Sequence, residues 1–444
     1  MPSVRIFYKR IQIKNQSNFP KNGAVFICSN HVNAFMDPLS VQLHSRRQIF
    51  SLARGDAFKN PFLRWLLTKW KLIPIYRISE GVANLKKNED TFLASCAVLT
   101  NGNPLVIYPE GSCIQERRLR KLKKGAARIV FGVEEQANFN ANLIVLPLGL
   151  IYSDPKKFRS NLFINFGEPI IAAKYAELYK HDKPRALNEL TAAIEVAMKA
   201  LVINIEHKEN DQFVEELYLV YKKQLSLDLK LDPTNLEHDF KVCCDIANAV
   251  NYYQTNEPQL ISNAKEKLSD YIESLNIPNL NDWLLTAKNL KSINALRVGI
   301  DALLLIIVLP FFLVGFITNY PPYKLGCQTA DKLAKEVEFH ASINMTIGWF
   351  AWIVYYLLQL VIIGLAFRSW LVVGIYALLV PISGFYVLQV EPLLQKANDR
   401  RRMLRFKTRN ENQFNQLIRD RVGLIALFDK AKNNYCAMLA RRKD

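Results

Sequence analysis

Hydrophobic residues follow two patterns along the first 205 residues. Six short runs are almost continuously apolar, as in parallel strands covered on both faces: Ala24–Ser29, Gln48–Ala53, Leu72–Tyr76, Leu105–Tyr108, Leu143–Leu150 and Leu162–Phe166. Between them lie segments with helical spacing, at 38–45, 57–71, 85–101, 123–136 and 174–205. Strands that alternate with helices are typical of an α/β domain. Residues 1–205 are therefore expected to form a mainly parallel sheet flanked by helices.

The character of the chain changes after residue 205. Residues 206–296 contain charged amphipathic stretches with helical spacing, broken at Asp232-Pro233 and Ile277-Pro278. No chemical motif stands out in this region. We therefore expect a helical connector between the α/β domain and the apolar region that begins near residue 297.

The longest apolar stretches lie in residues 297–391. Residues 299–319 carry one acid, Asp301, and are long enough to span about 30 Å of hydrocarbon. A second apolar block, 342–391, is interrupted by Arg368, which predicts a helical hairpin of about 342–366 and 369–390. About three transmembrane helices are thus expected, and with them an integral membrane protein.

The tail, residues 392–444, is amphipathic and basic. Its clusters, such as Arg400-Arg401-Arg402, favour the cytosolic side and contact with anionic lipid head groups. The N-terminal MPSVRIFYKR lacks the apolar stretch of a signal peptide, so the α/β domain is also expected on the cytosolic side. Three crossings would separate these two regions. Either 299–319 is re-entrant, which Pro310 would favour, or the second block does not cross twice.

Charge and cysteine content narrow the class of protein. The chain has 58 Lys+Arg against 40 Asp+Glu, a formal charge of +18, which suits nucleic acid or an anionic membrane surface. The apolar blocks and the lack of a nucleic-acid motif favour membrane lipids and no nucleic acid. The seven cysteines are irregularly spaced without a C-x-x-C pair, which indicates reduced thiols with no zinc site and no disulfide framework.

Candidate chemistry first appears in the segment ICSNHVNAFMDPLS. His31 follows an apolar strand, and ligands of α/β sheets bind at the carboxyl ends of strands. Histidine is suited to accept a proton from an alcohol near neutral pH, and Asp37 could hold its other ring nitrogen. In the alternative interpretation, Asp37 only caps a helix that begins at Pro38, and His31 is an ordinary loop residue.

Three more segments end in polar or charged residues at probable strand ends. They are Leu72–Arg77, which ends in Arg77; Val106–Ser112, which ends in Glu110-Gly111-Ser112 and precedes a basic run from Arg117 to Lys124; and Leu146–Gly149, which contains Pro147. Taken singly, Arg77 and the basic run would be interpreted as solvated surface. Their order together with His31 and Asp37 suggests one site.

The order and spacing of these segments resemble the four blocks of the glycerolipid acyltransferase family, over about residues 4–175. Asn30-His31 with Asp37 resembles the first block, Ile73 to Arg77 the second, Pro109 to Ser112 the third, and Val145 to Leu148 the fourth. Two departures are visible. Five residues separate His31 from Asp37 where the family has four, and Ser112-Cys113 stands where many members have Thr-Arg. The longer spacing resembles yeast-type glycerol-3-phosphate acyltransferases and related bacterial proteins.

The resemblance implies a role for each matching residue. His31 would be the general base, oriented by Asp37; Arg77 would bind the acceptor phosphate; Glu110, Gly111, Ser112 and Pro147 would line the acceptor site. The donor would be acyl-CoA or acyl-carrier protein, and the acceptor a glycerol-phosphate-type alcohol. No metal, no cofactor and no covalent acyl-enzyme is implied.

Three functions remain as hypotheses. Glycerol-3-phosphate in phospholipid biosynthesis is the first choice of acceptor. Lysophosphatidate (1-acylglycerol-3-phosphate) or another lysolipid is the alternative. A membrane-anchored polyanion-binding protein without enzymatic activity also explains the charge and the apolar blocks, but leaves the four ordered segments as coincidence.

Overall fold

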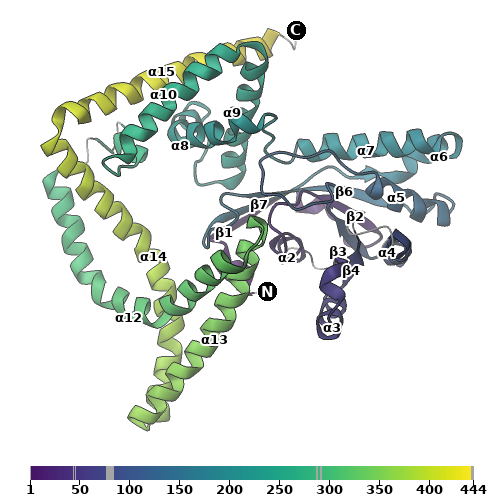
Figure 1. The fold of residues 1–444 in the computed structure, drawn as a ribbon, viewed down its shortest axis with the longest axis horizontal. Coiled ribbons are helices and arrows are strands. Elements are labelled where there is room, and N and C mark those ends of the chain that lie inside the picture. The colour runs from purple at the N-terminus through teal and green to yellow at the C-terminus, as the bar shows by residue number, and fades with distance from the viewer. Residues whose placement is uncertain are drawn as a thin grey trace. The chain divides into compact units, whose positions relative to one another are not determined.

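The computed structural model describes residues 2–441 except 44, 46, 77–84, 287–288 and 291–292. The chain forms two compact units, each composed of several stretches of sequence. The sheet unit comprises Met1–Asn204, Asn235–Phe240 and Leu333–Met345, and the helical unit comprises Ile205–Thr234, Lys241–Lys332 and Thr346–Asp444. Figure 1 labels most of the helices and strands of both units.

The sheet unit is built on one sheet in the order β1-β7-β6-β2-β5-β3-β4, with β8 paired to β6. All neighbouring strands are parallel except β7 and β8, which run antiparallel to β6. The strands are β1 Arg10–Lys14, β2 Val25–Ser29, β3 Phe50–Arg54, β4 Leu72–Ile75, β5 Pro104–Ile107, β6 Ile144–Tyr152, β7 Asn161–Phe166 and β8 Ile170–Ile171. The predicted mainly parallel α/β sheet is confirmed, and all six predicted strands are present.

Two strands were not predicted. β1 (RIQIK) is an edge strand whose residues are only partly buried, so it lacks the continuous apolar run that marks the central strands. β8 has two residues, too few to show any periodicity.

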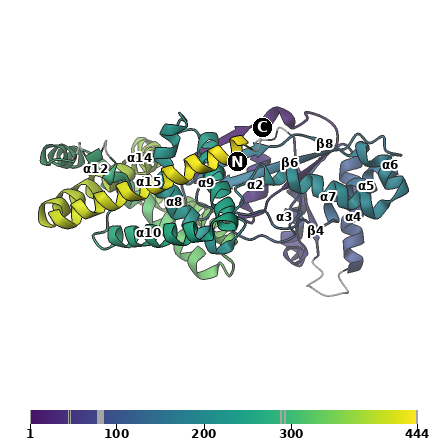
Figure 2. The same ribbon diagram turned by 90° about the horizontal axis from the view of Figure 1, so that it is seen from above.

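Alternating residues of the central strands face two cores. Phe26, Leu105 and Val145 belong to the core that α4 (Leu85–Thr100), α5 (Gly125–Gln136) and α7 (Lys183–Lys199) cover. Figure 2 shows these helices with α6 (Ala176–His181) at one end of the sheet unit. Ile27, Val106 and Leu146 belong to the opposite core, to which α1 (Pro2–Phe7) and α2 (Met36–Leu43) contribute. A further helix, α3 (Pro61–Lys69), precedes β4.

The single helix expected over 174–205 is instead two. The Asp182 carboxylate accepts a hydrogen bond from the Arg185 amide at 3.0 Å and caps α7, with Pro184 in its first turn. A cap residue and a proline at that position begin a new helix, so α6 ends at His181.

The helical unit holds the expected connector helices and three apolar helices. Its members are α8 Asp211–Asp228, α9 Leu236–Asn256, α10 Pro258–Asn276, α12 Ala295–Leu333, α13 His340–Phe367, α14 Trp370–Arg409 and α15 Glu411–Arg441; the first residues of α9 and α13 and the last of α12 belong to the sheet unit. Among the described residues, α12, α14 and the stretch Val337–Phe367 are long and apolar enough to cross a membrane. The expected break at Arg368 separates α13 from α14.

Two elements extend beyond the predicted limits. α12 continues through Pro310, Pro321 and Pro322 to Leu333, and α14 continues beyond its apolar part to Arg409. The domain limits expected at 205, 296 and 391 stay predictions, because the two units of the structure interleave in sequence.

Candidate active site

The chain is held firmly at Asn30, which directly follows the end of β2 and directly precedes His31. The Asn30 side-chain amide donates to the Leu150 carbonyl at 2.9 Å, and its oxygen accepts from the Leu150 amide at 2.8 Å. Leu150 lies on β6, the parallel neighbour of β2, so the asparagine side chain continues the ladder after the strand has ended. His31 therefore emerges at a fixed point on the carboxyl edge of the sheet.

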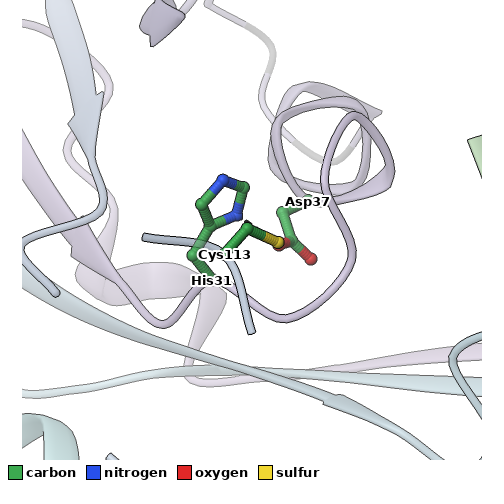
Figure 3. Close-up of side chains that lie close together, drawn as sticks. All are labelled: His31, Asp37 and Cys113. Carbon is green, nitrogen blue, oxygen red and sulfur yellow. Dashed lines mark hydrogen bonds and ion pairs between the residues drawn. The ribbon is translucent and has the colours of Figure 1, made fainter. Parts of the chain in front are cut away.

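His31 and Asp37 form a hydrogen-bonded pair. The His31 Nδ1 and Asp37 Oδ2 atoms are 2.7 Å apart, and the Asp37 side chain is fully buried. Figure 3 shows the other ring nitrogen directed away from Asp37. An ionised carboxylate only accepts hydrogen bonds, so in the neutral imidazole that pairs with it Nδ1 is the donor and Nε2 the acceptor.

The Asp37 carboxylate has further donors on both oxygens. Oδ2 accepts from the amides of Val32 and Asn33, each at 2.9 Å, and Oδ1 accepts from the Tyr152 hydroxyl at 2.7 Å. Asp37 is the second residue of α2, so the two amide bonds run back into the preceding turn, while Tyr152 reaches Asp37 from β6. The alternative in which Asp37 serves only as the cap of a helix starting at Pro38 is therefore wrong. The turn absorbs the extra residue of the His31–Asp37 spacing.

The adjacent strand β5 delivers a second set of side chains to the same edge. The His31 ring stacks on the Tyr108 ring, with centroids 4.0 Å apart and an interplanar angle of 16°. The His31 amide donates to Glu110 Oε1 at 3.1 Å, while the Arg120 amide and Nε donate to Oε2 at 3.2 and 3.0 Å. Glu110 thus links the His31 backbone to Arg120.

Burial and nearby charge have opposite effects on the pKa of the Glu110 carboxyl. Burial raises the pKa of the Glu110 carboxyl, and the Arg120 guanidinium and the two backbone amides oppose that rise. Arg120 also donates to the hydroxyl and the carbonyl of Ser112. An arginine of the basic run is therefore committed to holding the Glu110–Ser112 turn.

The turn itself requires glycine. Gly111 has a φ of +74°, and a Cβ atom there would lie 2.6 Å from Lys123 Nζ. Its amide donates to the Tyr108 carbonyl at 3.0 Å, and the Lys123 amide donates to the Pro109 carbonyl at 2.8 Å. Only a residue without a side chain adopts this backbone without strain and leaves room for Lys123.

Cys113 lies beside the pair, as Figure 3 shows. Its sulfur accepts from the Ala34 amide at 3.2 Å, and burial, reinforced by the negative charge of Asp37, raises the pKa of its thiol far above the usual range. Donor atoms of His31, Asp37 and Cys113 lie within 4.8 Å of one another. They fit a metal poorly, because Asp37 Oδ2 already receives three donors and a thiol is a weak ligand.

Two further residues of the predicted site are Arg77 and Pro147. Arg77 lies outside the described residues. Pro147 is buried within β6, in register with Cys28 of β2, which precedes His31 by three residues.

Three contributors were missed by the sequence reasoning. Tyr108 directly precedes Pro109-Glu110, so its position beside the motif was a usable signal. Tyr152 and Glu338 carry no such signal, since only the fold brings them near. Glu338 is buried in the short turn Val337–Phe339, and its Oε1 accepts from the Gln115 amide at 2.9 Å. Phe339 packs on Phe35, with centroids 6.4 Å apart.

Together these features define an α/β domain with a hydrogen-bonded histidine–aspartate pair at the carboxyl ends of its central strands. Residues 10–150, which include His31, Asp37, Glu110 and Pro147, match the family model described as Acyltransferase. This region is therefore an acyltransferase domain, and the predicted resemblance to the glycerolipid acyltransferase family is supported.

Curated relatives agree with this assignment. Glycerol-3-phosphate O-acyltransferase 1 of Saccharomyces cerevisiae is 26% identical over 53% of this chain and 31% of its own length. Glycerol-3-phosphate O-acyltransferase 2 of the same yeast is 24% identical over 56% and 33%. An uncharacterized acyltransferase of Schizosaccharomyces pombe is 29% identical over 49% and 45%. The chain thus matches less than half of the length of each of these relatives.

Among solved structures, the 1-acyl-sn-glycerophosphate (LPA) acyltransferase PlsC from Thermotoga maritima is 15% identical. The similarity covers 45% of this chain and 75% of that one, with a TM-score of 0.31.

Proposed function

We propose that the protein is an O-acyltransferase that moves a fatty acyl group from acyl-CoA or acyl-carrier protein to glycerol-3-phosphate. The observation that carries the proposal is the His31–Asp37 pair at 2.7 Å, with Nε2 left as an acceptor. Both nitrogens of a neutral imidazole are then assigned, one to the carboxylate and one to the substrate hydroxyl.

The reaction follows from this assignment. His31 Nε2 takes the proton of the acceptor hydroxyl as its oxygen attacks the thioester carbonyl carbon. The new C–O bond forms, the C–S bond breaks, and the proton passes to the departing thiolate. Asp37 stabilises the imidazolium that exists between these steps. Because the thioester is already activated, the protein mainly positions two substrates and supplies the base.

The remaining motif residues are assigned to the acceptor. Arg77 would bind its phosphate, for which a guanidinium fork is suited. Glu110, Gly111 and Ser112 would line the acceptor site through the turn that Arg120 holds, and Pro147 would line it from β6. Glycerol-3-phosphate is preferred because two of the relatives carry that acceptor in their names. Lysophosphatidate or another lysolipid is the alternative acceptor.

The test is an assay of the purified full-length protein with labelled acyl-CoA, with H31A against H181A as the matched control. His181 is an exposed histidine at the end of α6. General-base assistance is worth about 10² to 10⁴ in rate, so H31A should lose nearly all activity and H181A none. Full activity of H31A would refute the mechanism. Absence of transfer by the unsubstituted protein to every acceptor would favour the non-enzymatic membrane protein.

A panel of glycerol-3-phosphate, dihydroxyacetone phosphate and lysophosphatidate identifies the acceptor. The expected order has glycerol-3-phosphate first. R77A should raise the acceptor KM and leave the donor KM unchanged, because a phosphate would lose a charge-assisted partner. We place the sheet unit on the cytosolic side, where a water-soluble thioester is available.

A further inference from the structure

Prolines interrupt the hydrogen-bond ladder of α12 deep within its length. Pro321 and Pro322 have no amide proton, so the carbonyls four residues earlier, those of Ile317 and Thr318, lose their helical donors. A carbonyl without a donor is costly in a bilayer, where water cannot replace it.

Helix α13 supplies the missing donors one for one. The Tyr355 hydroxyl donates to the Ile317 carbonyl at 3.3 Å, and Gln359 Nε2 donates to the Thr318 carbonyl at 3.1 Å. The same relation recurs on α14, where Pro381 frees the Ala377 carbonyl and the Tyr356 hydroxyl donates to it at 2.7 Å. Three proline-freed carbonyls thus each receive a side chain of α13.

These contacts fix how deep this part of α12 lies. At about 1.5 Å per residue, Gln359 and Tyr355 are about 12 and 18 Å along α13 from its end at Phe367. That is near the middle of a hydrocarbon layer about 30 Å thick. The segment around Thr318 and Asn319 is therefore at mid-depth.

Both ends of α12 belong on one side of the membrane. Leu333 and the following turn are part of the sheet unit, and a compact folded domain cannot straddle a bilayer. In the described parts of 205–294, no helix meets the length and hydropathy of a span, so Ala295 starts on the side of the sheet unit too. A helix whose two ends share one side and whose middle lies at mid-depth has not crossed.

Contacts of the other membrane helices agree. Buried Asp301, near the start of α12, pairs with Arg400 on the polar continuation of α14. On α15, Arg421 pairs with Asp282 at 2.8 Å. The start of α12 and the basic tail therefore lie at the same end of the helical bundle. Figure 1 shows α12 bent sharply along its length, while the turn between α13 and α14 projects beyond the bend.

We propose that α12 is a re-entrant helix that enters and leaves the membrane on the same side, and that the α13–α14 hairpin is the crossing element. Exposed apolar residues such as Leu303, Ile306 and Phe311 then face lipid. The sheet unit, the turn Val337–Phe339 and the basic tail share one side. This arrangement removes the conflict that three crossings create, and it places the Glu338 contact with the active-site loop at the membrane surface.

The experiment is cysteine labelling in sealed membrane vesicles with a membrane-impermeant maleimide. In a background with Cys113, Cys244, Cys327 and Cys436 changed to serine, single cysteines replace exposed residues of four regions. These are K199C in the sheet unit, K335C after α12, R368C between α13 and α14, and Q413C in the tail. Labelling after addition of detergent shows that each site is reactive.

The expected result is that K199C, K335C and Q413C react from one side and R368C only from the other. If K335C reacts together with R368C, α12 crosses and the proposal is wrong. If Q413C reacts together with R368C, or R368C together with K199C, the hairpin does not cross, which equally overturns it. Trypsin digestion of sealed vesicles holding the unsubstituted protein is a second measurement. Cleavage at Lys335 with protection at Arg368 is expected from the K199C side.

Discussion

The active-site edge and the helical bundle both bury polar groups, but the hydrogen bonds to these groups have different consequences in the two regions. In the bundle, each freed carbonyl of Ile317, Thr318 and Ala377 receives its own donor. At the sheet edge, Asp37 is saturated by four hydrogen bonds so that one acceptor, His31 Nε2, remains available. Saturation serves stability in the first region, and in the second it fixes the orientation of the His31 ring, the proposed general base.

The largest expected effect is that of a substitution at Asp37, the buried acceptor of the active-site edge. D37N should lower kcat by about 10² to 10⁴, because the amide cannot accept from every donor around it and His31 loses its orientation. It should also destabilise the fold by about 1–3 kcal/mol, since buried donors lose a partner. Acyl-transfer kinetics and thermal unfolding measure both. The exposed D182N variant, which disturbs only the α7 cap, is the control. Unchanged kcat in D37N would mean that the pair does not act in catalysis.

The next effect concerns the turn that Arg120 holds. R120A leaves the buried Glu110 carboxylate without its cation, which should destabilise the sheet unit by about 3 kcal/mol. Exposed R185A, which breaks a surface pair with Glu189, should change stability by less than about 1 kcal/mol. Chemical denaturation of both variants measures the difference. Equal stabilities would show that the Glu110–Arg120 pair is dispensable.

The same variant has a defined pH dependence. Because the pKa of Glu110 is raised in the fold, holding it ionised destabilises the protein. That destabilisation is absent when the pH is below 4.5, the ordinary pKa of the carboxyl. It grows as the pH rises and reaches its full size above the pKa of Glu110 in the folded protein. Without Arg120 the folded pKa rises further. The stability deficit of R120A should therefore shrink as the pH is lowered, and a deficit that grew would exclude Glu110 as its cause.

A smaller effect is expected in the bundle. Q359L removes the donor to the Thr318 carbonyl and should destabilise the membrane helices by about 1 kcal/mol, the usual scale of a hydrogen bond between membrane helices. Combined with P322A, which restores a helical donor, the same change should cause less loss. The coupling between the two changes is measured by unfolding the unsubstituted protein, Q359L, P322A and the double variant in detergent. Y386F, a change on α14, is the control. Additive effects would mean that Gln359 does not compensate for the proline.

The smallest effect belongs to Cys113. C113S should retain activity within a few-fold, because the raised pKa keeps the sulfur a thiol and a serine hydroxyl can also accept from the Ala34 amide. Initial rates at saturating acyl-CoA measure this. A loss as large as that of H31A, together with a labelled acyl group retained on the unsubstituted protein after denaturation, would indicate an acyl-cysteine intermediate instead.

Local sequence was sufficient to predict most of the strands and to nominate a candidate site. The apolar runs of β2, β5 and β6 are continuous because parallel strands are covered on both faces, so they are visible without the fold. His31 and Glu110 follow two of them directly, and parallel strands end at the same edge. The break at Arg368 was readable for a related reason, since a charge between two apolar stretches of spanning length marks a turn.

Relations between distant segments were decided only by the tertiary structure. Tyr152 donates to Asp37 across 115 positions, and Glu338 accepts from Gln115 across 223. No pattern in the sequence around either residue predicts these partners. The division of the predicted helix at Asp182 could have been predicted from the sequence, but it depends on a single side chain that caps α7. The course of α12 could not have been predicted. A proline in an apolar stretch indicates that a helical hydrogen bond is lost, but it does not indicate which helix supplies the replacement donor.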